Sequence, residues 1–303
     1  MRRSLICAFL CLALLPAWAA EHARVLNFGP VCLGRIIRLP GLDPLKWPKG
    51  GPVVADARGR VLVPDGPLLI NGAEPIAEHG DVIGRLPADS IAYLNLDNLS
   101  INDDFIEKLG RLTGLQKLSM RETEVSDKGL AVLKRFPNLA DLIVTNTNLR
   151  GTTLGQLAGL TKLRRLVIAD NKLEPVAYEG IGKLTALQVL EISHCGADDR
   201  SLSHLTNLKR VYRFSAANNP HITPAGLKYL RLPSLVELQM QGCGLRPCDY
   251  LVFKGTKVKV INLEGVYRGS AQVRLLKKQW PDLEISYTRQ DPKWPTELFA
   301  PLH

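Results

Sequence analysis

The stretch LTKLRRLVIADNKL, residues 160–173, decides the fold. Its apolar side chains follow the spacing apolar-x-x-apolar-x-apolar at Leu163, Leu166 and Ile168, and Asn171 comes three residues later. An amphipathic helix would place apolar residues three and four positions apart throughout, whereas a half-buried strand would alternate strictly. The stretch has neither pattern, so it indicates a short strand followed by a turn.

The same spacing recurs along the chain. Units begin 24 residues apart, at Ile91, Leu115, Leu139, Leu163 and Leu187. The next match begins at Leu208 after 21 residues and the following one at Leu235 after 27, which restores the register. Another unit begins at Val258, 23 residues further on. A fixed period of this length predicts stacked repeats, because each unit can bury its leucines only against its neighbours.

These motifs resemble those of leucine-rich repeat proteins. The resemblance is carried by LTKLRRLVIADNKL, by LTALQVLEISHCGA (184–197) and by LPSLVELQMQGCGL (232–245). Two further stretches, VSDKGLAVLKRFPNL (125–139) and ITPAGLKYLRLPSL (222–235), resemble a variant common in bacterial, exported proteins of this type. The resemblance covers about residues 90 to 266. It implies an α/β fold of about eight repeats of about 24 residues, with a curved parallel sheet on the concave side and short helices or turns on the convex side. The scaffold hosts many binding tasks, so it names no partner.

The turns and return segments agree with this architecture. The ninth position of each unit should turn the chain away from the strand, and it holds Leu99, Thr123, Thr147, Asn171, Cys195, Cys243 and Val266. An Asn, Thr or Cys side chain there can donate to backbone carbonyls that would otherwise be unpaired. Residues 102–112 and 126–136 begin with N-cap residue types and continue with helical spacing, which predicts short helices.

The residues before the first repeat show no repeat register. Residues 1–19 have the features of a secretory signal peptide, with Arg2 and Arg3 before an apolar run and Ala17-Trp18-Ala19 before the expected cleavage site. The run is shorter than the roughly 20 residues that span a bilayer, so an uncleaved anchor is the weaker alternative. The sequence therefore predicts a secreted or periplasmic protein.

The rest of the chain divides around the repeats. We expect an N-terminal capping region over residues 20–88, leucine-rich repeats over 89–266, and a C-terminal cap with a truncated repeat and a tail over 267–303. A separate small domain at 20–88 is the alternative. The runs Val53–Ala55 and Val61–Val63 flank DARGR and predict a hairpin. The stretch QWPDLEISY (279–287) indicates the truncated repeat, and the final DPKWPTELFAPLH is expected to fold back as a lid or to fray.

Positive charge is concentrated near the C-terminal end. The chain has a formal net charge of +10. Residues 254–278 contribute Lys254, Lys257, Lys259, Arg268, Arg274, Lys277 and Lys278 against a single acid, Glu264. A solvated basic edge is the plain interpretation, and attraction to an anionic surface or an acidic partner is the functional alternative. The predicted export disfavours nucleic acid as the partner.

Four cysteines lie beyond the predicted signal peptide. Cys195 and Cys243 occupy equivalent positions two repeats apart, about 10 Å by the spacing of parallel strands. That exceeds the roughly 7 Å over which a disulfide can form, so both are expected to be buried turn residues. Cys243 and Cys248 are close enough in sequence for a local disulfide to be possible. Cys32 has no evident partner.

The sequence contains no catalytic motif on which an enzymatic function could rest. It lacks a Gly-rich phosphate loop, a nucleophile elbow and a pair of histidines on one helix, so no metal or cofactor is predicted. Candidate partner-binding residues instead lie at the strand positions that the resemblance places on the concave face, or, for His194, just after such a strand. They are Lys117, Asp141, Arg165, His194, Arg210, Tyr212 and Glu237. Arg and Tyr are enriched at binding hot spots, which draws attention to the cluster from Arg165 to Tyr212.

Two functional hypotheses follow. The first is an exported, non-catalytic protein–protein interaction module that grips a partner protein with its concave face. The second is a structural, envelope-associated protein held to an anionic surface by its basic C-terminal end. A homodimer through the same face also stays open.

The sixth unit is expected to be irregular. Starting at Leu208, it would place Val211 and then Arg213 or Phe214 in the core. A buried unpaired arginine is costly, so we expect a bulge that turns Phe214 inward and Arg213 outward. Asn218 or Asn219 would then take the turn role of Asn171. Residues 215–221 would form a projecting loop beside Arg210 and Tyr212.

Overall fold

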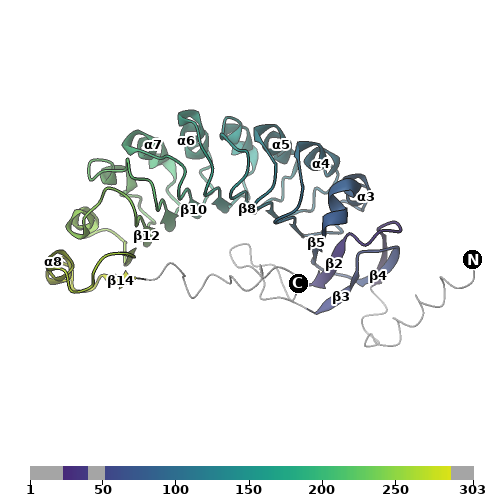
Figure 1. The fold of residues 1–303 in the computed structure, drawn as a ribbon, viewed down its shortest axis with the longest axis horizontal. Helices are drawn as coiled ribbons and strands as arrows, with labels where there is room; N and C mark the ends of the chain where they lie inside the picture. Colours follow the sequence, from purple (N-terminus) through teal and green to yellow (C-terminus); the bar gives the residue numbers. More distant parts are fainter. Residues whose placement is uncertain (1–22, 40–51, 288–303) are drawn as a thin grey trace, which may run out of the picture.

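The protein is a curved leucine-rich repeat solenoid, as predicted. The computed structural model describes residues 23–39 and 52–287, and the predicted signal peptide and the final tail lie outside them. Short strands line the inner side of the arc and helices line its outer side (Figure 1). Each 24-residue unit supplies one strand and one return segment, so the repeat period measured in the sequence becomes the repeat of the structure.

One sheet runs the length of the arc. Its strand order is β14-β13-β12-β11-β10-β9-β8-β7-β6-β5-β2-β3. Neighbours from β5 to β14 pair in parallel. The parallel strands are β5 (Leu68–Gly72), β6 (Tyr93–Asn95), β7 (Lys117–Ser119), β8 (Asp141–Ile143), β9 (Arg165–Val167), β10 (Val189–Glu191), β11 (Arg213–Ser215), β12 (Glu237–Gln239), β13 (Val260–Asn262) and β14 (Glu284–Ser286). β14 adds the truncated last repeat that the sequence predicts.

The convex side consists of short helices. The α-helices are α3 (Gly80–Gly84), α4 (Asp103–Lys108), α5 (Asp127–Val132), α6 (Pro175–Gly182), α7 (Asp199–Ser203) and α8 (Ala271–Gln279). The 3-10 helices are η1 (Glu74–His79), η2 (Leu133–Arg135), η3 (Leu154–Gly159), η4 (His204–Asn207), η5 (Leu227–Leu230) and η6 (Pro247–Phe253). The Asn102 side chain caps α4 and the Ser126 side chain caps α5, so both predicted short helices are confirmed.

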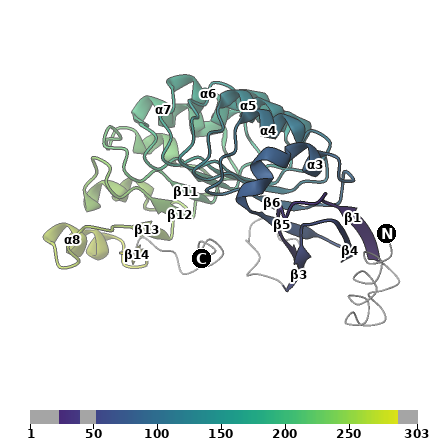
Figure 2. The same cartoon turned by 45° about the vertical axis from the view of Figure 1, so that its right-hand side comes forward.

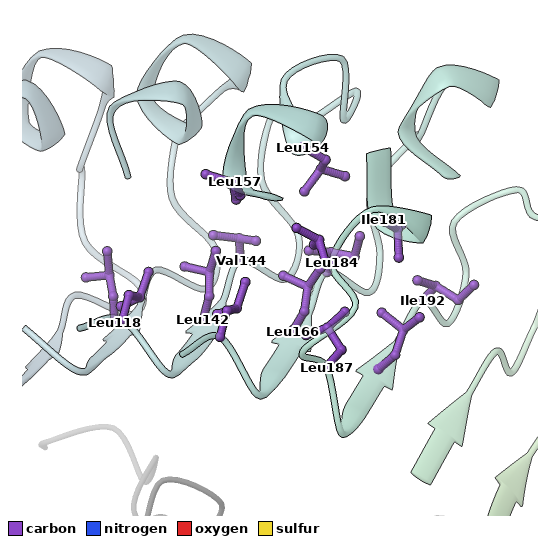
Figure 3. Close-up of a cluster of buried hydrophobic side chains, with 14 of the residues drawn as sticks. Leu118, Leu142, Val144, Leu154, Leu157, Leu166, Ile181, Leu184, Leu187 and Ile192 are labelled. Carbon is purple, nitrogen blue, oxygen red and sulfur yellow. The ribbon is translucent and has the colours of Figure 1, made fainter. Parts of the chain in front are cut away.

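The core lies between strands and helices. Leu142, Val144 and Leu166 from the strand side face Leu157 and Ile181 from the helix side (Figure 3). All five side chains are fully buried. The leucines of neighbouring units thus share one continuous core, as the stacking argument requires.

The N-terminal region extends the sheet with antiparallel strands. β2 (Gly34–Arg38) pairs with both β5 and β3 (Val53–Asp56). β1 (Ala23–Asn27) and β4 (Arg60–Pro64) form a separate two-stranded sheet at the same end of the arc (Figure 2). The predicted hairpin is therefore wrong: both apolar runs are strands, but β3 pairs with β2 and β4 with β1. The parallel ladder already begins at β5, inside the range predicted as the cap.

The turn after each strand is built the same way in successive repeats. Residues 24 apart adopt left-handed backbone angles with φ between 52° and 58°: Asn98, Glu122, Asn146, Asp170, His194 and Asn218. In the repeats where the next residue is Thr, Asn or Cys, that residue carries the donor that the ninth-position argument predicts, whereas Leu99 has none. Asn171 Nδ2 donates to the carbonyls of Val144, Ile168 and Ala169 at 2.7–3.1 Å. Cys195 Sγ and Cys243 Sγ donate to carbonyls of the preceding repeat at 3.2 and 3.1 Å.

The cysteines of the described residues are free thiols. Cys243 Sγ points to the Ala216 carbonyl, whereas Cys248 Sγ lies 3.6 Å from the Gln272 carbonyl. The two sulfurs thus contact different neighbouring repeats, and the local disulfide that the sequence left open is not formed. Burial raises the pKa of the Cys195 thiol to about 12, as expected for a structural turn residue.

The sixth unit begins at Val211, not at Leu208. Phe214 in β11 lies opposite Leu190 in β10 and Leu238 in β12, and its side chain is fully buried. The spacing from Leu187 to Val211 and from Val211 to Leu235 is therefore the usual 24 residues. Leu208 is buried as well, but it ends η4 on the helix side. The predicted spacings of 21 and 27 residues are therefore wrong, and the sixth and seventh units both follow the regular spacing of 24 residues.

Parts of the prediction for this unit hold. Phe214 points inward, Arg213 lies on the concave face, and Asn219 takes the turn role: its Nδ2 donates to three carbonyls, as that of Asn171 does. The bulge and the projecting loop are wrong. Ser215 belongs to β11, which pairs with β10 without a register shift, and Asn219 is fully buried. Residues 215–221 form the ordinary turn of a repeat.

Candidate partner-binding face

The concave face presents alternate residues of each strand. Because side chains alternate across a strand, the first and third residues of each short strand point away from the helices, and the central residue enters the core. The first-residue row of the central strands reads Tyr93, Lys117, Asp141, Arg165, Val189, Arg213, Glu237 and Val260. Parallel pairing places each of these beside the equivalent residue of the next repeat, so charges of both signs alternate along much of the row.

Three of the predicted site residues form one buried charge cluster. Asp141 Oδ2 lies 3.0 Å from Arg165 Nη1 and 3.5 Å from Lys117 Nζ. The Lys117 ammonium also lies 4.9 Å from the centre of the Tyr93 ring. Lys117 and Asp141 are fully buried, and Arg165 is 4 % exposed. These charges are buried together, so they present little charge to solvent.

Apolar side chains accompany this cluster in the N-terminal half of the concave face. Leu69, Tyr93, Ile143 and Val167 belong to a buried apolar group that also includes Leu39 and is separate from the main core. Ile143 is fully buried and Val167 is 3 % exposed. The N-terminal half of the face is therefore largely inaccessible, which leaves the strands from β10 onward as the accessible half.

The accessible half carries a second charge group. Arg213 Nε lies 2.8 Å from Glu237 Oε2, and both side chains are 17 % exposed. Gln239 Nε2 donates to Glu237 Oε1 at 2.9 Å. Ser193 and Ser215 share a hydrogen bond of 2.9 Å between their hydroxyls. Partly exposed polar groups of this kind can exchange a hydrogen bond or ion pair within the protein for one with a bound partner.

Glu191 lies between the two charge groups. Burial raises the pKa of its carboxyl group, and Arg165 and Arg121 partly oppose that effect. Asp97 follows β6, three strands from Arg165, and burial likewise raises the pKa of its carboxyl group. Ser119 Oγ and the Arg121 amide donate to Asp97 Oδ1 at 2.5 and 2.8 Å, which partly opposes that effect. The concave face therefore holds carboxylates whose ionisation is unfavourable in the absence of further positive charge.

We expect Glu191→Gln to stabilise the protein at pH 7 but not below pH 4. The raised folded-state pKa means that the carboxyl group's contribution is fully present below its unfolded-state pKa, about 4.3, and is lost as the pH rises through the folded value. Neutral glutamine avoids that loss. Urea unfolding at both pH values measures the difference, and Glu179→Gln on the exposed surface of α6 controls for net charge. Equal stability of Glu191→Gln and wild type at pH 7 would contradict the expected shift.

His194 lies at the edge of the face. Its Nδ1 is 3.0 Å from Asp170 Oδ1, and both side chains are exposed. With Glu122, Asn146 and Lys172 they line a pocket of about 350 Å³ where the strands end. The row of left-handed turn residues thus places polar side chains along one edge of the sheet.

Arg210 and Tyr212 do not lie where the sequence prediction puts them. They precede β11, at the edge where the chain enters each strand, because the sixth unit starts three residues later than expected. Arg213 takes the concave position instead. The spacing of 24 residues from Val189 to Arg213, and from Asn171 through Cys195 to Asn219, is the signal that identifies this register. The predicted set therefore separates into a buried cluster, an accessible position at Glu237, an exposed turn residue and two edge residues.

Comparisons with known proteins add a fold likeness only. No family model matches the chain, and no curated protein matches it. Among solved structures, an internalin (InlF) from Listeria monocytogenes is similar, with 17 % identity and a TM-score of 0.47. The match covers 69 % of this chain and 71 % of that chain.

Two properties of the described residues bear on function. No group of three or more His, Cys, Asp or Glu side chains in residues 23–39 and 52–287 is arranged to hold a metal ion. None of the helices in those residues combines the length and the apolar character needed to cross a bilayer.

Proposed function

We propose that this protein is an exported, non-catalytic interaction module that binds a partner protein through the C-terminal half of its concave face. The supporting observation is the charge group of Arg213, Glu237 and Gln239, whose two charged side chains are 17 % exposed, on a parallel sheet beside a buried half. A leucine-rich repeat sheet offers a broad, preformed surface, which lowers the ordering cost of binding.

Charge complementarity would select the partner. Arg213 and Glu237 stand one strand apart, about 5 Å by the usual strand spacing, so they present an ordered pair of opposite charges. A partner with an acidic group facing Arg213 and a basic group facing Glu237 can replace the internal ion pair by two intermolecular ion pairs. Complementary charges across an interface contribute to specificity and association rate more than to affinity. The net positive charge of the chain further favours an acidic partner.

A charge swap tests this proposal. The double variant Arg213→Glu/Glu237→Arg keeps an internal ion pair but reverses its order along the sheet. A partner isolated with the wild-type chain from an envelope extract should bind the swap variant at least about tenfold more weakly, as loss of one strong charged contact implies. Calorimetric titration gives the two dissociation constants, and an unchanged melting temperature excludes misfolding. Equal affinity for both proteins would show that the partner does not contact this pair.

Attachment to an anionic surface through the C-terminal end is a second candidate. Lys254, Lys257 and Lys259 are exposed there, which supports it. However, these lysines precede β13, whereas Arg268 follows β13 and stacks on the Tyr287 ring at 4.5 Å. The basic residues of this end are therefore distributed over both ends of one strand rather than gathered in one patch.

A further inference from the structure

One edge of the solenoid is basic along almost its whole length. Because the strands are parallel, the chain enters all of them at the same edge, which we call the entry edge. It consists of the last residue of each helix and the segment that leads from it to the next strand, from residues 108–116 before β7 to residues 253–259 before β13. Each of these stretches contains lysine or arginine, and none contains aspartate or glutamate. The charge predicted at the C-terminal end is thus one end of a much longer feature.

The cations of the entry edge follow the repeat register. One row holds Arg111, Arg135, Lys183 and Arg231, which share one position of the repeat. That row lacks a cation in two repeats, where Gly159 and Asn207 stand.

A second row fills both gaps. It lies three residues further along each repeat and places Lys162 after Gly159 and Arg210 after Asn207. Lys257 continues this row before β13. Every repeat from β7 to β13 therefore contributes a cation, at intervals of about 5 Å set by the strand spacing.

These cations are exposed and lack carboxylate partners. Arg111, Arg135, Lys162, Lys183, Arg210 and Arg231 are all exposed. Lys162 Nζ donates to Asn138 Oδ1, a neutral acceptor. Among the ion pairs of the described residues, none involves a cation of the entry edge. Like charges closer than the screening length of about 8 Å repel one another, so the edge is favourable for a bound polyanion.

Helix-end electrostatics explains only part of this pattern. Cations near a helix C-terminus are favourable, and Arg135 at the end of η2 fits that role. Lys162, Arg210 and Lys257 lie beyond the ends of η3, η4 and η6 and gain little from a helix dipole. Asp97, Glu122 and Asp170 lie at the opposite edge, where strands end, whereas the entry-edge segments from β7 to β13 contain no acid. The entry edge is therefore purely basic, while the opposite edge carries charges of both signs.

The chemistry of the entry edge selects among polyanions. Exposed large apolar side chains of the described residues are Val25, Val53, Val176, Tyr267 and Leu275, and all lie outside the entry-edge segments. A bilayer would be expected to engage apolar anchors, and single-stranded nucleic acid needs aromatic rings for its bases to stack on. Cations, hydroxyls and amides spaced along a line suit a chain of anionic sugars.

We infer that the entry edge binds a linear anionic polysaccharide, laid across successive repeats with its carboxylate, sulfate or phosphate groups against the two cation rows. This binding is independent of the concave face. A protein partner could therefore be held on one surface while the solenoid is anchored to a polymer by another. The predicted export is consistent with such a polymer, but the inference rests on the edge itself.

The test uses heparin fragments of increasing length as the probe and the full chain as the binder. Affinity, measured by fluorescence anisotropy at about 50 mM salt, should rise with fragment length until the fragment spans the edge, and should fall steeply as salt increases. The variant Lys162→Gln/Arg210→Gln/Lys257→Gln should bind about tenfold more weakly or worse, with a salt slope lower by about one for each cation removed.

A matched variant separates site from net charge. Arg150→Gln/Lys172→Gln/Arg246→Gln removes the same charge from the opposite edge, where all three side chains are exposed, and should bind heparin fragments as wild type does. Equal losses in the two triple variants would overturn the inference, because net charge alone would then explain binding. Affinity that does not change with fragment length would also overturn it.

Two competitors test the class of polyanion. Tighter binding to phosphatidylglycerol vesicles, or to single-stranded DNA of matched charge, would replace the polysaccharide by a lipid surface or a nucleic acid and so overturn the inference. Stronger binding to heparin than to either supports it. None of these results depends on a protein partner, so the proposal for the concave face stands or fails separately.

Discussion

Replacing Asn219 with alanine is expected to lower the free energy of unfolding by about 3 kcal/mol or more, since each buried polar group left unpaired costs about 1–3 kcal/mol. The fully buried amide donates to the carbonyls of Ile192, Ala216 and Ala217. Its oxygen accepts from the amides of Cys195 and Ala197 at 3.1 and 2.9 Å. Loss of the side chain leaves backbone groups of two repeats unpaired.

The neighbouring asparagine is the control for this change. Asn218 is exposed and has a φ of 56°, so Asn218→Gly keeps an accessible backbone conformation and should change the stability by less than about 1 kcal/mol. Urea unfolding followed by circular dichroism measures both variants. A wild-type stability for Asn219→Ala would mean that the turn ladder does not hold the repeats together.

Phe214→Ala is expected to cost about 3–5 kcal/mol, the usual loss for a fully buried phenylalanine. The ring lies in the core between Leu190 and Leu238 of the adjacent strands. Tyr212→Ala removes an aromatic ring two residues earlier, from a half-buried position at the entry edge, and should cost about 1 kcal/mol. Thermal unfolding of the two variants therefore tests the placement of Phe214 in the core. A larger loss for Tyr212→Ala than for Phe214→Ala would contradict that placement.

The period of 24 residues was sufficient to predict the fold, because stacking converts a sequence repeat directly into a structural one. The sixth unit shows where apolar pattern alone fails. Leu208 and Val211 have the spacing of the first two apolar residues of a unit, so they are mistaken for its start. The true third apolar position of the unit holds Ala216, whose small side chain is a weak apolar signal. Leu208 is a helix-side core residue equivalent to Leu184. The turn asparagine, Asn219, marks the register more reliably because its hydrogen bonds leave little freedom of position.

Pairing and burial could not be predicted locally. The runs in β3 and β4 have strand character, but their choice of partners depends on β1 and β2, which lie earlier in the chain. Lys117, Asp141 and Arg165 are on the concave face as expected, yet their burial depends on their mutual pairing and on packing that no single repeat encodes. Of the seven predicted binding residues, four lie on the concave face, and three of those four are buried.

The affinity ratio of two single charge reversals tests the central claim that the concave face binds a partner. Arg213→Glu and Arg210→Glu make the same change in net charge three residues apart, one on the concave face and one at the entry edge. With both proteins folded by circular dichroism, we expect the partner to bind Arg213→Glu at least about tenfold more weakly and Arg210→Glu within about twofold of wild type. An equal loss in both variants, or a loss confined to Arg210→Glu, would contradict a concave binding face.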